Sequence, residues 1–433
     1  MQPLDYTAKY CVVGAGSSGL TAAKNLDQLG IACDVIERED DVGGNWYYGK
    51  PHSSVYKSTH LISSKPGTEY VDFPMPAEYP DYPSHWQVFE YFKSYARAFD
   101  LYRLIQFNTS VEHIERAGEF WDITLDSGAT RRYGGLVIAN GHNWDPKYPA
   151  YPGEFSGLCL HSADYKTSDV LVDKRVLVVG AGNSGCDIAV ESAQNARTTF
   201  HSTRRGYYYA PKFVLGMPSD QIAERGLRLR IPLALRRAFN VMLIKVILGD
   251  PTKYGLPKPD HKFYETHPIV NSQMLYYVGH GEIKPKPDVQ ELRGDRVLFS
   301  DGSEEPIDVL IYATGYNITF PFIDRQYLNW HANRPNLYMN IFHPQYDNFF
   351  VAGLIQPDSG QWGLVDYQAQ LIARFVHAQR HNPTRAAEFR RTKSGAQPRL
   401  NHGIKYVNST RHYLEVEHFS YRNGLKKLIR QFR

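Results

Sequence analysis

Two glycine-rich segments, far apart in the chain, have the residue types and spacing of turns that hold phosphate groups. The first is Gly14-Ala15-Gly16-Ser17-Ser18-Gly19, and the second is Gly180-Ala181-Gly182-Asn183-Ser184-Gly185. Glycines at these spacings allow a tight turn, a close approach of the backbone to a pyrophosphate and close packing of the following helix. The helix N-terminus behind such a turn supplies free N–H groups and a positive dipole end. Each segment therefore predicts a dinucleotide site.

The first glycine segment lies inside a complete strand–turn–helix–strand unit. The apolar run Tyr10–Val13 predicts a buried strand, a helical pattern runs from Leu20 to Leu29, and a second strand is expected over Ile31–Ile36. That strand ends at Glu37, whose carboxylate can accept hydrogen bonds from a ribose diol. A unit closed by an acid in this position suits the adenosine half of FAD.

The second unit closes with the opposite charge. A strand is expected over Arg175–Val179, a helix over Cys186–Ala193 and a strand over 197–201, after which the chain reads Ser-Thr and then Arg204 and Arg205. A carboxylate at this point would repel a 2′-phosphate, whereas guanidinium groups can bind one in a fork. The second unit is therefore expected to take NADPH in preference to NADH. The alternative is that both arginines are solvated loop charges.

Two further predicted strands end in turns of small residues. Leu136–Ala139 precedes Gly141, and Val309–Tyr312 precedes Ala313-Thr314-Gly315. Turns of this kind let the chain cross close over a cofactor.

Length and composition limit the classes of protein. The 433 residues suffice for two or three domains, and 42% apolar with 22% charged residues is a globular composition. A net charge of +4 is too balanced to indicate a nucleic-acid partner. The four cysteines form no CxxC pair and no metal-ligand spacing, so we expect no metal and a reducing, cytoplasmic compartment. The N-terminus lacks a signal-peptide pattern, and no apolar run predicts a transmembrane anchor.

Motifs over most of the chain, from about Lys9 to His377, resemble those of the flavin-containing monooxygenases, class B flavoprotein monooxygenases, in their soluble bacterial form. Residues 155–165, FSGLCLHSADY, match the family fingerprint FxGxxxHxxxY at every fixed position. Gly43–Trp46 looks like the family motif GGxW, Tyr312–Tyr316 is similar to FATGY, and Gly353–Pro357 resembles a family segment near the flavin.

The resemblance implies an α/β chain of two nested, Rossmann-like dinucleotide-binding domains. The FAD domain is expected to be discontinuous, over 1–165 and 296–433, and the NADP domain to be inserted as 166–295 with a helical insert at about 206–272. It further implies an N,N-dimethylaniline monooxygenase-like enzyme. NADPH reduces FAD, the reduced flavin and O₂ give a C4a-(hydro)peroxyflavin, and a small soft nucleophile, an amine or a sulfide, takes one oxygen atom. Homodimers are common among relatives.

The resemblance assigns cofactor contacts residue by residue. Those assigned to FAD are Gly14, Gly16, Ser17, Ser18, Gly19, Glu37, Gly44, Asn45, Trp46, His52, Val111 and Gln356. Those assigned to NADP are Gly180, Gly182, Asn183, Ser184, Gly185, Arg204 and Arg205.

One position departs from the family pattern. The segment Ser58–Lys65 aligns with a stretch in which the family carries an Asn near the flavin–NADP⁺ junction, but here that position is Ile62. Isoleucine has no donor or acceptor. Another polar group, His60, Ser63 or His142, could replace the amide. Alternatively, the substrate range shifts to Baeyer–Villiger oxidation of ketones, or the enzyme acts as an uncoupled NADPH oxidase. A non-catalytic redox sensor that binds both dinucleotides is a further alternative.

Several smaller features keep two interpretations each. The basic amphipathic stretch 227–249 could attach to a membrane surface, or it could pack its apolar face on the body and frame a substrate entrance. His142 could be catalytic or could pack the turn after Gly141. The tyrosines Tyr207–Tyr209 could stack on NADP or line an entrance, or form a surface packing cluster.

Overall fold

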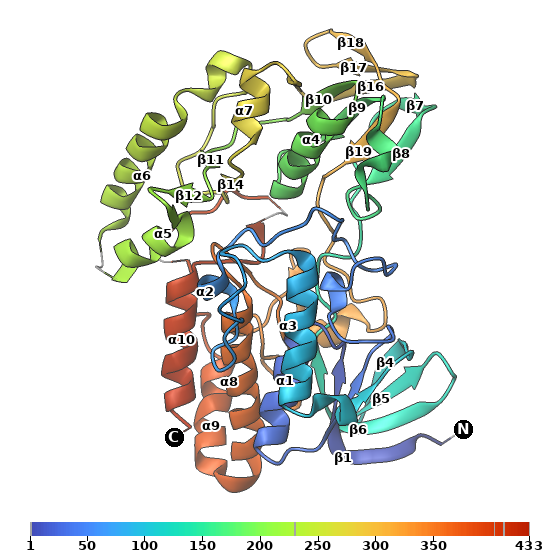
Figure 1. Ribbon diagram of the computed structural model, residues 1–433. Helices are drawn as coiled ribbons and strands as arrows, with labels where there is room; N and C mark the ends of the chain where they lie inside the picture. The colour runs from blue at the N-terminus through green and yellow to red at the C-terminus, as the bar shows by residue number, and fades with distance from the viewer. Residues whose placement is uncertain (1, 229–230, 402, 410–411, 433) are drawn as a thin grey trace.

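The protein is built on two separate β-sheets, and a strand of each sheet leads into one of the two glycine turns (Figure 1). The structure is a computed structural model that describes residues 2–228, 231–401, 403–409 and 412–432. Figure 1 shows the first sheet with α1, α3 and α8 in the lower half of the molecule, and the second sheet with α4 in the upper half. The expected α/β class is confirmed.

The first sheet contains seven strands within the described residues. In spatial order they are β3 (Ile105–Gln106), β2 (Cys33–Ile36), β1 (Leu4–Val13), β6 (Thr130–Ile138), β5 (Phe120–Leu125) and β4 (Val111–Ala117), with β22 (Phe349–Val351) also paired to β6. β1 pairs in parallel with both β2 and β6, whereas β4, β5 and β6 form an antiparallel meander. The chain order thus reverses between β1 and β6, and such a reversal opens a crevice beyond the strand ends.

Both faces of the first sheet are buried, because successive side chains of β1 enter different cores. Tyr10 and Val12 pack with α1 (Ser17–Gln28), α3 (His85–Ala98), α8 (Trp362–His381) and α10 (His418–Arg430), while Cys11 and Val13 pack with Trp121 and Phe349 on the other face. Within the first core, the buried Lys24 of α1 lies 3.3 Å from the Asp366 carboxylate of α8 and 2.6 Å from that of Asp72. These ion pairs fix the helix that follows the first glycine turn.

The second sheet is wholly parallel and, like the first, contains a strand that leads directly into a glycine turn. Its strands in spatial order are β15 (Ile283–Lys286), β10 (Thr198–Ser202), β9 (Arg175–Val179), β19 (Val309–Tyr312) and β8 (Leu158–His161). α4 (Asn183–Asn195) and α7 (Met274–Gly279) pack together on it. A smaller sheet follows beside it, in the order β18 (Glu304–Pro306), β17 (Arg296–Phe299), β16 (Val289–Gly294) and β7 (Gly153–Phe155).

The second sheet draws its strands from a wider part of the chain than 166–295. β8 precedes that range, and β19 follows it and lies between β8 and β9. We therefore propose domain limits nearer to 153 and 312. The chain passes from the first fold to the second over 139–152 and returns over 313–322. These two linkers are hydrogen-bonded side by side: Lys147 N–H donates to Gly315 O at 3.0 Å and Asn317 N–H to Asp145 O at 2.9 Å.

Both helices behind the glycine turns begin three residues earlier than expected, α1 at Ser17 and α4 at Asn183, directly after the extended glycines Gly16 and Gly182. The turn thus delivers the chain straight into the first helical N–H groups. Among the described residues, no helix combines the length and apolarity needed to cross a membrane.

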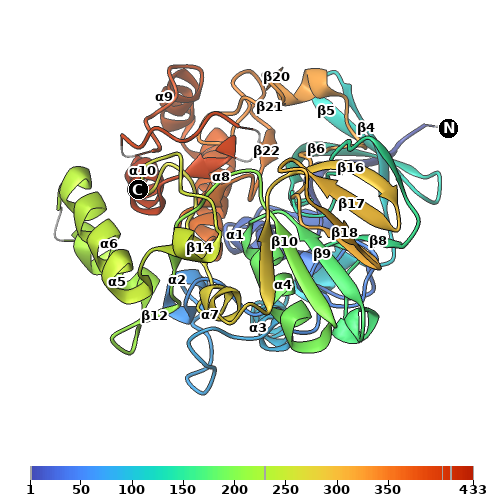
Figure 2. The ribbon, with the colours of Figure 1, turned by 90° about the horizontal axis from the view of Figure 1, so that it is seen from above.

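The insert is more varied than the helical segment that was expected. It contains the helices α5 (Ser219–Arg228) and α6 (Leu233–Leu248) together with the short strands β11 (Tyr209–Ala210), β12 (Phe213–Val214), β13 (Met217–Pro218) and β14 (Ile269–Val270). Leu229 and Arg230, inside the amphipathic stretch, lie outside the described residues. Figure 2 shows α6 at the edge of the molecule. Leu235, Phe239, Met242 and Val246 of α6 are 62%, 53%, 57% and 77% exposed, so the expectation that this face packs on the body is wrong for them.

Candidate active site

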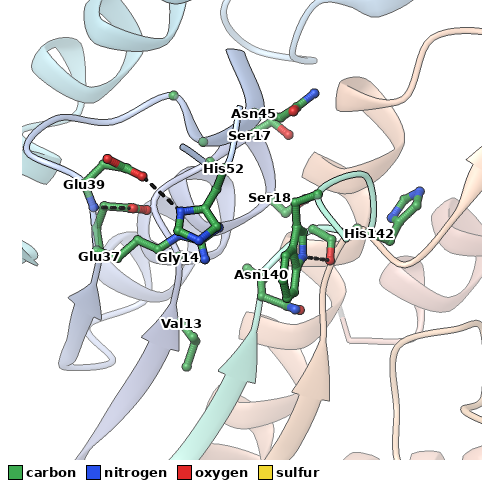
Figure 3. A pocket seen from close by; sticks show the side chains of 18 of the residues that line it. Val13, Gly14, Ser17, Ser18, Glu37, Glu39, Asn45, His52, Asn140 and His142 are labelled. Carbon is green, nitrogen blue, oxygen red and sulfur yellow. Dashed lines mark hydrogen bonds and ion pairs between the residues drawn. The ribbon is translucent and has the colours of Figure 1, made fainter. Parts of the chain in front are cut away.

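A cavity of about 510 Å³ opens where β1 and β6 end (Figure 3). Nearly all residues assigned to FAD from the sequence line it: Gly14, Gly16, Ser17, Ser18, Glu37, Gly44, Asn45, Trp46, His52 and Val111. Gln356 lines a second cavity instead, and Gly19 lines neither. The structure thus brings the first glycine turn, the carboxylate of Glu37 and the GGxW segment together at the ends of the sheet strands.

Close backbone packing explains the glycines around this first cavity. Gly14 has a φ of +99°, and a Cβ there would lie 2.9 Å from the carbonyl oxygen of Ala139 at the end of β6. A Cβ on Gly44, at φ +53°, would lie 2.9 Å from the Cα of Gly16. Gly19 allows α1 to pack on the turn, because its Cβ would meet Gly14 O at 1.8 Å. The turn is therefore a side-chain-free cradle, which fits the phosphates of a dinucleotide.

Glu37 forms the acidic end of the first cavity. Its Oε2 accepts a hydrogen bond from Ala15 N–H at 2.6 Å, and its Oε1 accepts one from Glu39 N–H at 2.9 Å. Burial raises the pKa of this carboxyl, and the two N–H donors oppose that shift. A carboxylate offers about four lone-pair sites, so Glu37 can hold the glycine turn and still accept from a ribose diol.

His52 lies at the same end of the cavity as Glu37. Its Nδ1 is 3.4 Å from Glu39 Oε1, and its ring meets that of Trp144 edge-on. Figure 3 shows Glu37, Glu39 and His52 on one side of the pocket and His142 on the other. The two histidines would therefore border different parts of a ligand in this cavity.

A second cavity of about 710 Å³ opens where β9 and β19 end. Of the residues assigned to NADP, those that line it are Gly180, Gly182, Asn183, Ser184, Arg204 and Arg205. Gly180, at φ +115°, repeats the relation of Gly14, since its Cβ would lie 2.4 Å from Ala313 O at the end of β19. Gly185 lines neither cavity and, like Gly19, lets its helix pack on the turn, because its Cβ would meet Gly180 O at 2.0 Å.

The two arginines of the second cavity are in different electrostatic states. Arg205 forms a fork with Asp260 of the insert, with Nη2 2.8 Å from both carboxylate oxygens, and this pair lowers the pKa of Asp260. Arg204 is exposed and forms no ion pair among the described residues. Of the two guanidinium groups expected at the 2′-phosphate, Arg205 is thus already paired with Asp260, whereas Arg204 is without an ion-pair partner in the described part of the chain.

Six side chains border both cavities, which therefore meet. They are Asn45, Trp46, His142, Asn143, Gln361 and Trp362. Trp46 and Trp362 pack edge to face with ring centroids 5.8 Å apart. Burial lowers the pKa of His142 to about 4, so its imidazole is neutral near pH 7. A ligand that fills the first cavity and one that fills the second come together at these residues.

Ile62 lies in the wall of the second cavity and is 42% exposed. His60 and Ser63 border the same cavity but not the first, and His60 Nδ1 is 2.9 Å from Ser58 O. The loop that carries Ile62 is anchored at Lys65, whose Nζ donates to the carbonyl oxygens of Pro76, Ala77 and Tyr79 at 3.1, 3.1 and 2.8 Å. Of the three polar candidates, only His142 reaches the junction of the cavities.

The fingerprint residues build the crossing between the folds. A Cβ on Gly157 would lie 2.5 Å from Asp308 O, so the turn from β7 to β8 needs a glycine for close packing. His161 is fully buried, accepts from Ala163 N–H through Nδ1 and meets the rings of Tyr148 and Tyr316 on the two linkers edge-on. Tyr165 is buried against Tyr56. These side chains position the linkers.

Sequence reasoning missed several lining residues. Arg38 borders the first cavity, Gln361 and Trp362 border both, and Asp187 borders the second. Asp187 lies one turn after Asn183 on α4, its Oδ1 accepts from Asn271 Nδ2 at 2.6 Å, and burial raises its pKa. Its i+4 spacing from Asn183 could have indicated it, because both side chains share one helix face.

The cysteines take no part in either cavity. All four are free thiols, and three are buried: Cys11, Cys33 and Cys186. Burial raises the pKa of Cys33 to about 12. In the described part of the chain, no cluster of three His, Cys, Asp or Glu side chains has the geometry of a metal site.

Two Rossmann-like folds whose ligand cavities meet define the class of oxidoreductases that combine a flavin with a nicotinamide dinucleotide. Residues 7–431 match the family model described as flavin-binding monooxygenase-like, and the chain belongs to this family. It is a flavin-dependent monooxygenase, and its cofactors are FAD and NADPH.

Similarity to known proteins supports the assignment of the chain to this family. The chain is 31% identical over 444 residues to human flavin-containing monooxygenase 5, covering 97% of this chain and 82% of the relative. It is 32% identical over 399 residues to dimethylaniline monooxygenase [N-oxide-forming] 2 of Macaca mulatta, covering 87% and 74%. The structure of S-allyl-L-cysteine S-oxygenase from Allium sativum is similar in fold, with a TM-score of 0.67 and 19% identity over 98% of this chain and 88% of that one.

Proposed function

We propose that this protein oxygenates small soft nucleophiles, by N- or S-oxidation of amines or sulfides, at the junction of its two cavities. The observation that carries the proposal is the set of six side chains that border both cavities. An N-oxide-forming relative supports the amine class. The second cavity extends past the glycine turn to Ile62, Thr68 and Leu414, which leaves room for a small molecule beside the cofactors.

FAD is assigned to the first cavity. The turn at Gly14 would hold the pyrophosphate, Glu37 the ribose diol, and Trp46 with His142 would border the reactive ring. When bound, FAD supplies the activation of O₂ with electrons taken from NADPH. The residues around the junction would orient the rings, and the packed indoles of Trp46 and Trp362 would help to exclude water.

NADPH is assigned to the second cavity. The Gly180 turn and the start of α4 would hold its pyrophosphate, and Arg204 its 2′-phosphate. Asn183 is held by the insert, since its Oδ1 accepts from Val270 N–H at 2.9 Å. The insert would therefore form part of the wall on which NADPH lies.

A second candidate function rests on Ile62. An exposed aliphatic side chain in this wall favours either Baeyer–Villiger oxidation of ketones or uncoupled oxidation of NADPH with release of H₂O₂. A redox sensor without turnover is the remaining alternative. The four free thiols support a reducing, cytoplasmic location. The homodimer rests on the family resemblance alone.

Three measurements on the purified protein separate these functions. We expect a yellow protein that NADPH bleaches much faster than NADH does. The bleached protein is then mixed with O₂ and with a tertiary amine, a thioether or a cyclic ketone, and products and H₂O₂ are quantified together. N-oxide or sulfoxide in proportion to NADPH supports the proposal, lactone supports Baeyer–Villiger oxidation, and stoichiometric H₂O₂ supports the oxidase. A protein that binds FAD but is not reduced by either nicotinamide is a sensor.

A further inference from the structure

Asn45 presents a fixed hydrogen-bond donor to the junction of the two cavities. Its Oδ1 accepts from the backbone N–H of Ser54 at 2.8 Å and from the Ser54 hydroxyl at 2.7 Å. A backbone N–H can only donate, so the amide oxygen must face Ser54 and the NH₂ group must point the other way. Among the described residues no group accepts from this NH₂, and Asn45 borders both cavities.

The backbone around Asn45 is rigid, so the donor is preorganised. Ser53, which is 2% exposed, donates from its hydroxyl to Asn45 O at 2.7 Å. Lys166, the residue after the fingerprint, donates from Nζ to Ser53 O at 2.6 Å. On the other side Gly44 lies against Gly16 of the first glycine turn. Asn45 is thus held between the first turn and the linker that leads to the second fold.

The other amides at the junction cannot play this part. Gln361 donates from its Nε2 to Gly353 O at 3.1 Å and to Ile355 O at 3.0 Å, which occupies both of its N–H groups. Asn143 is exposed, and among the described residues no hydrogen bond orients its amide. Ile62, on the wall of the second cavity, offers no polar atom.

We propose that the Asn45 NH₂ group holds the nicotinamide end of NADP⁺ at the junction with the flavin, by donating a hydrogen bond to a carbonyl acceptor there, and that it thereby limits the loss of electrons to O₂. This inference rests on the proposed assignment of FAD and NADPH to the two cavities. A donor that is already fixed before the ligand arrives costs little reorganisation when it binds. The same bond would keep the nicotinamide over the junction, where its ring covers the flavin against water.

The test removes the NH₂ donor of Asn45 and keeps the hydrogen bonds that its side-chain oxygen accepts from Ser54. In Asn45→Asp the side chain still accepts from both Ser54 donors but has no NH₂, and Asn143→Asp places the same charge at the same junction as its control. Each holoenzyme is titrated with NADP⁺ while the flavin absorbance is recorded. FAD content and melting temperature report folding, and H₂O₂ formed per NADPH reports the electron loss.

We expect Asn45→Asp to weaken NADP⁺ binding by about three- to tenfold, the range for one hydrogen bond, and to raise H₂O₂ formation. Asn143→Asp should change both by clearly less, with FAD content and melting temperature alike in the two variants. Equal NADP⁺ dissociation constants in wild type and Asn45→Asp would overturn the inference. If Asn45→Asp does not fold, the uncharged Asn45→Leu is judged by the same criterion. A wild-type protein that binds no FAD or NADP⁺ would instead refute the proposed function.

Discussion

The carboxylate of Asp220, at the start of α5 in the insert, accepts two hydrogen bonds from Ser64, one from its backbone N–H at 2.7 Å and one from its hydroxyl at 2.8 Å. Ser64 is fully buried and lies two residues after Ile62. Tyr82 adds a second link, because its hydroxyl donates to Lys212 O at 2.6 Å. The insert on the second fold therefore fastens the loop that forms one wall of the second cavity.

Removing the Asp220 carboxylate should release this loop. Asp220→Ala leaves the buried Ser64 donors without an acceptor, so we expect a loss of about 1–3 kcal/mol in the free energy of unfolding and a higher H₂O₂ yield per NADPH. Gln221→Ala, at the next position of α5, is the control and should cost less than about 0.5 kcal/mol. Denaturant unfolding and a peroxide assay measure the two effects. An unchanged peroxide yield in Asp220→Ala would show that the loop stays in place without the insert.

The two arginines should contribute unequally to the choice of nicotinamide. Arg204 forms no ion pair among the described residues, so Arg204→Ala should raise the dissociation constant of NADPH about tenfold or more and leave that of NADH nearly unchanged. Arg205 is engaged by Asp260, and Arg205→Ala should therefore discriminate less between the two nucleotides. Equilibrium titration of both nucleotides measures this. Equal losses for NADPH and NADH in Arg204→Ala would refute its role at the 2′-phosphate.

A substitution at position 62 should improve the coupling of NADPH oxidation to oxygenation. Ile62→Asn places an amide on an exposed position of the cavity wall, so no buried polar group is created and stability should change by less than about 1 kcal/mol. We expect less H₂O₂ and more oxygenated product per NADPH, because the wall of the second cavity then carries a hydrogen-bond donor where it now has only an aliphatic group. The matched change Ile62→Leu should leave the product ratio as it is. If Asn and Leu give the same ratio, the apolar side chain is not the cause of electron loss.

The buried His201 should make the protein acid-sensitive. Its Nε2 donates to Gly180 O at 3.0 Å, and burial lowers its pKa to about 4. The unfolded chain binds this proton near pH 6.5, so the contribution of the neutral folded histidine is complete above pH 6.5 and is lost as the pH falls toward 4. Between pH 7 and pH 5, His201→Gln should lose about 2 kcal/mol less stability than wild type. Parallel losses in the two proteins would contradict this account.

The glycine turns and their sheets were predictable because their causes are local. Gly14 and Gly180 need positive φ and lie against the carbonyl oxygens of Ala139 and Ala313, which follow β6 and β19. Both strands had been expected, each ending in a turn of small residues. The sequence therefore located the two cavities. The two helices begin three residues before the starts expected from the sequence. They begin inside the glycine turns, where the low helix propensity of glycine and serine hides the start.

The position of β19 could not be predicted, because strand pairing is decided by distant parts of the chain. Val309–Tyr312 is fully apolar, so its pattern fits either sheet, and only its pairing with β8 and β9 places it in the second. The ion pair of Arg205 with Asp260 was also hidden, since it joins residues 55 positions apart. The exposure of α6 was also not predictable, because an apolar helix face like the one its side chains form normally packs against the protein core.

The paired linkers restrict how the two folds can move. A body attached by one flexible strand can twist, tilt and shift, but here two strands run between the same bodies and are hydrogen-bonded to each other at Lys147–Gly315 and Asp145–Asn317. Twisting about the ribbon or sliding along it would break these bonds, whereas bending the ribbon keeps them. The ribbon by itself would therefore allow one bending motion, and the hydrogen bonds of Ser64 to Asp220 and of Tyr82 to Lys212 oppose that motion from the side of the insert. The Ile62 loop lies where the insert meets the first fold, so any bending of the ribbon would have to break the bonds that fasten this loop.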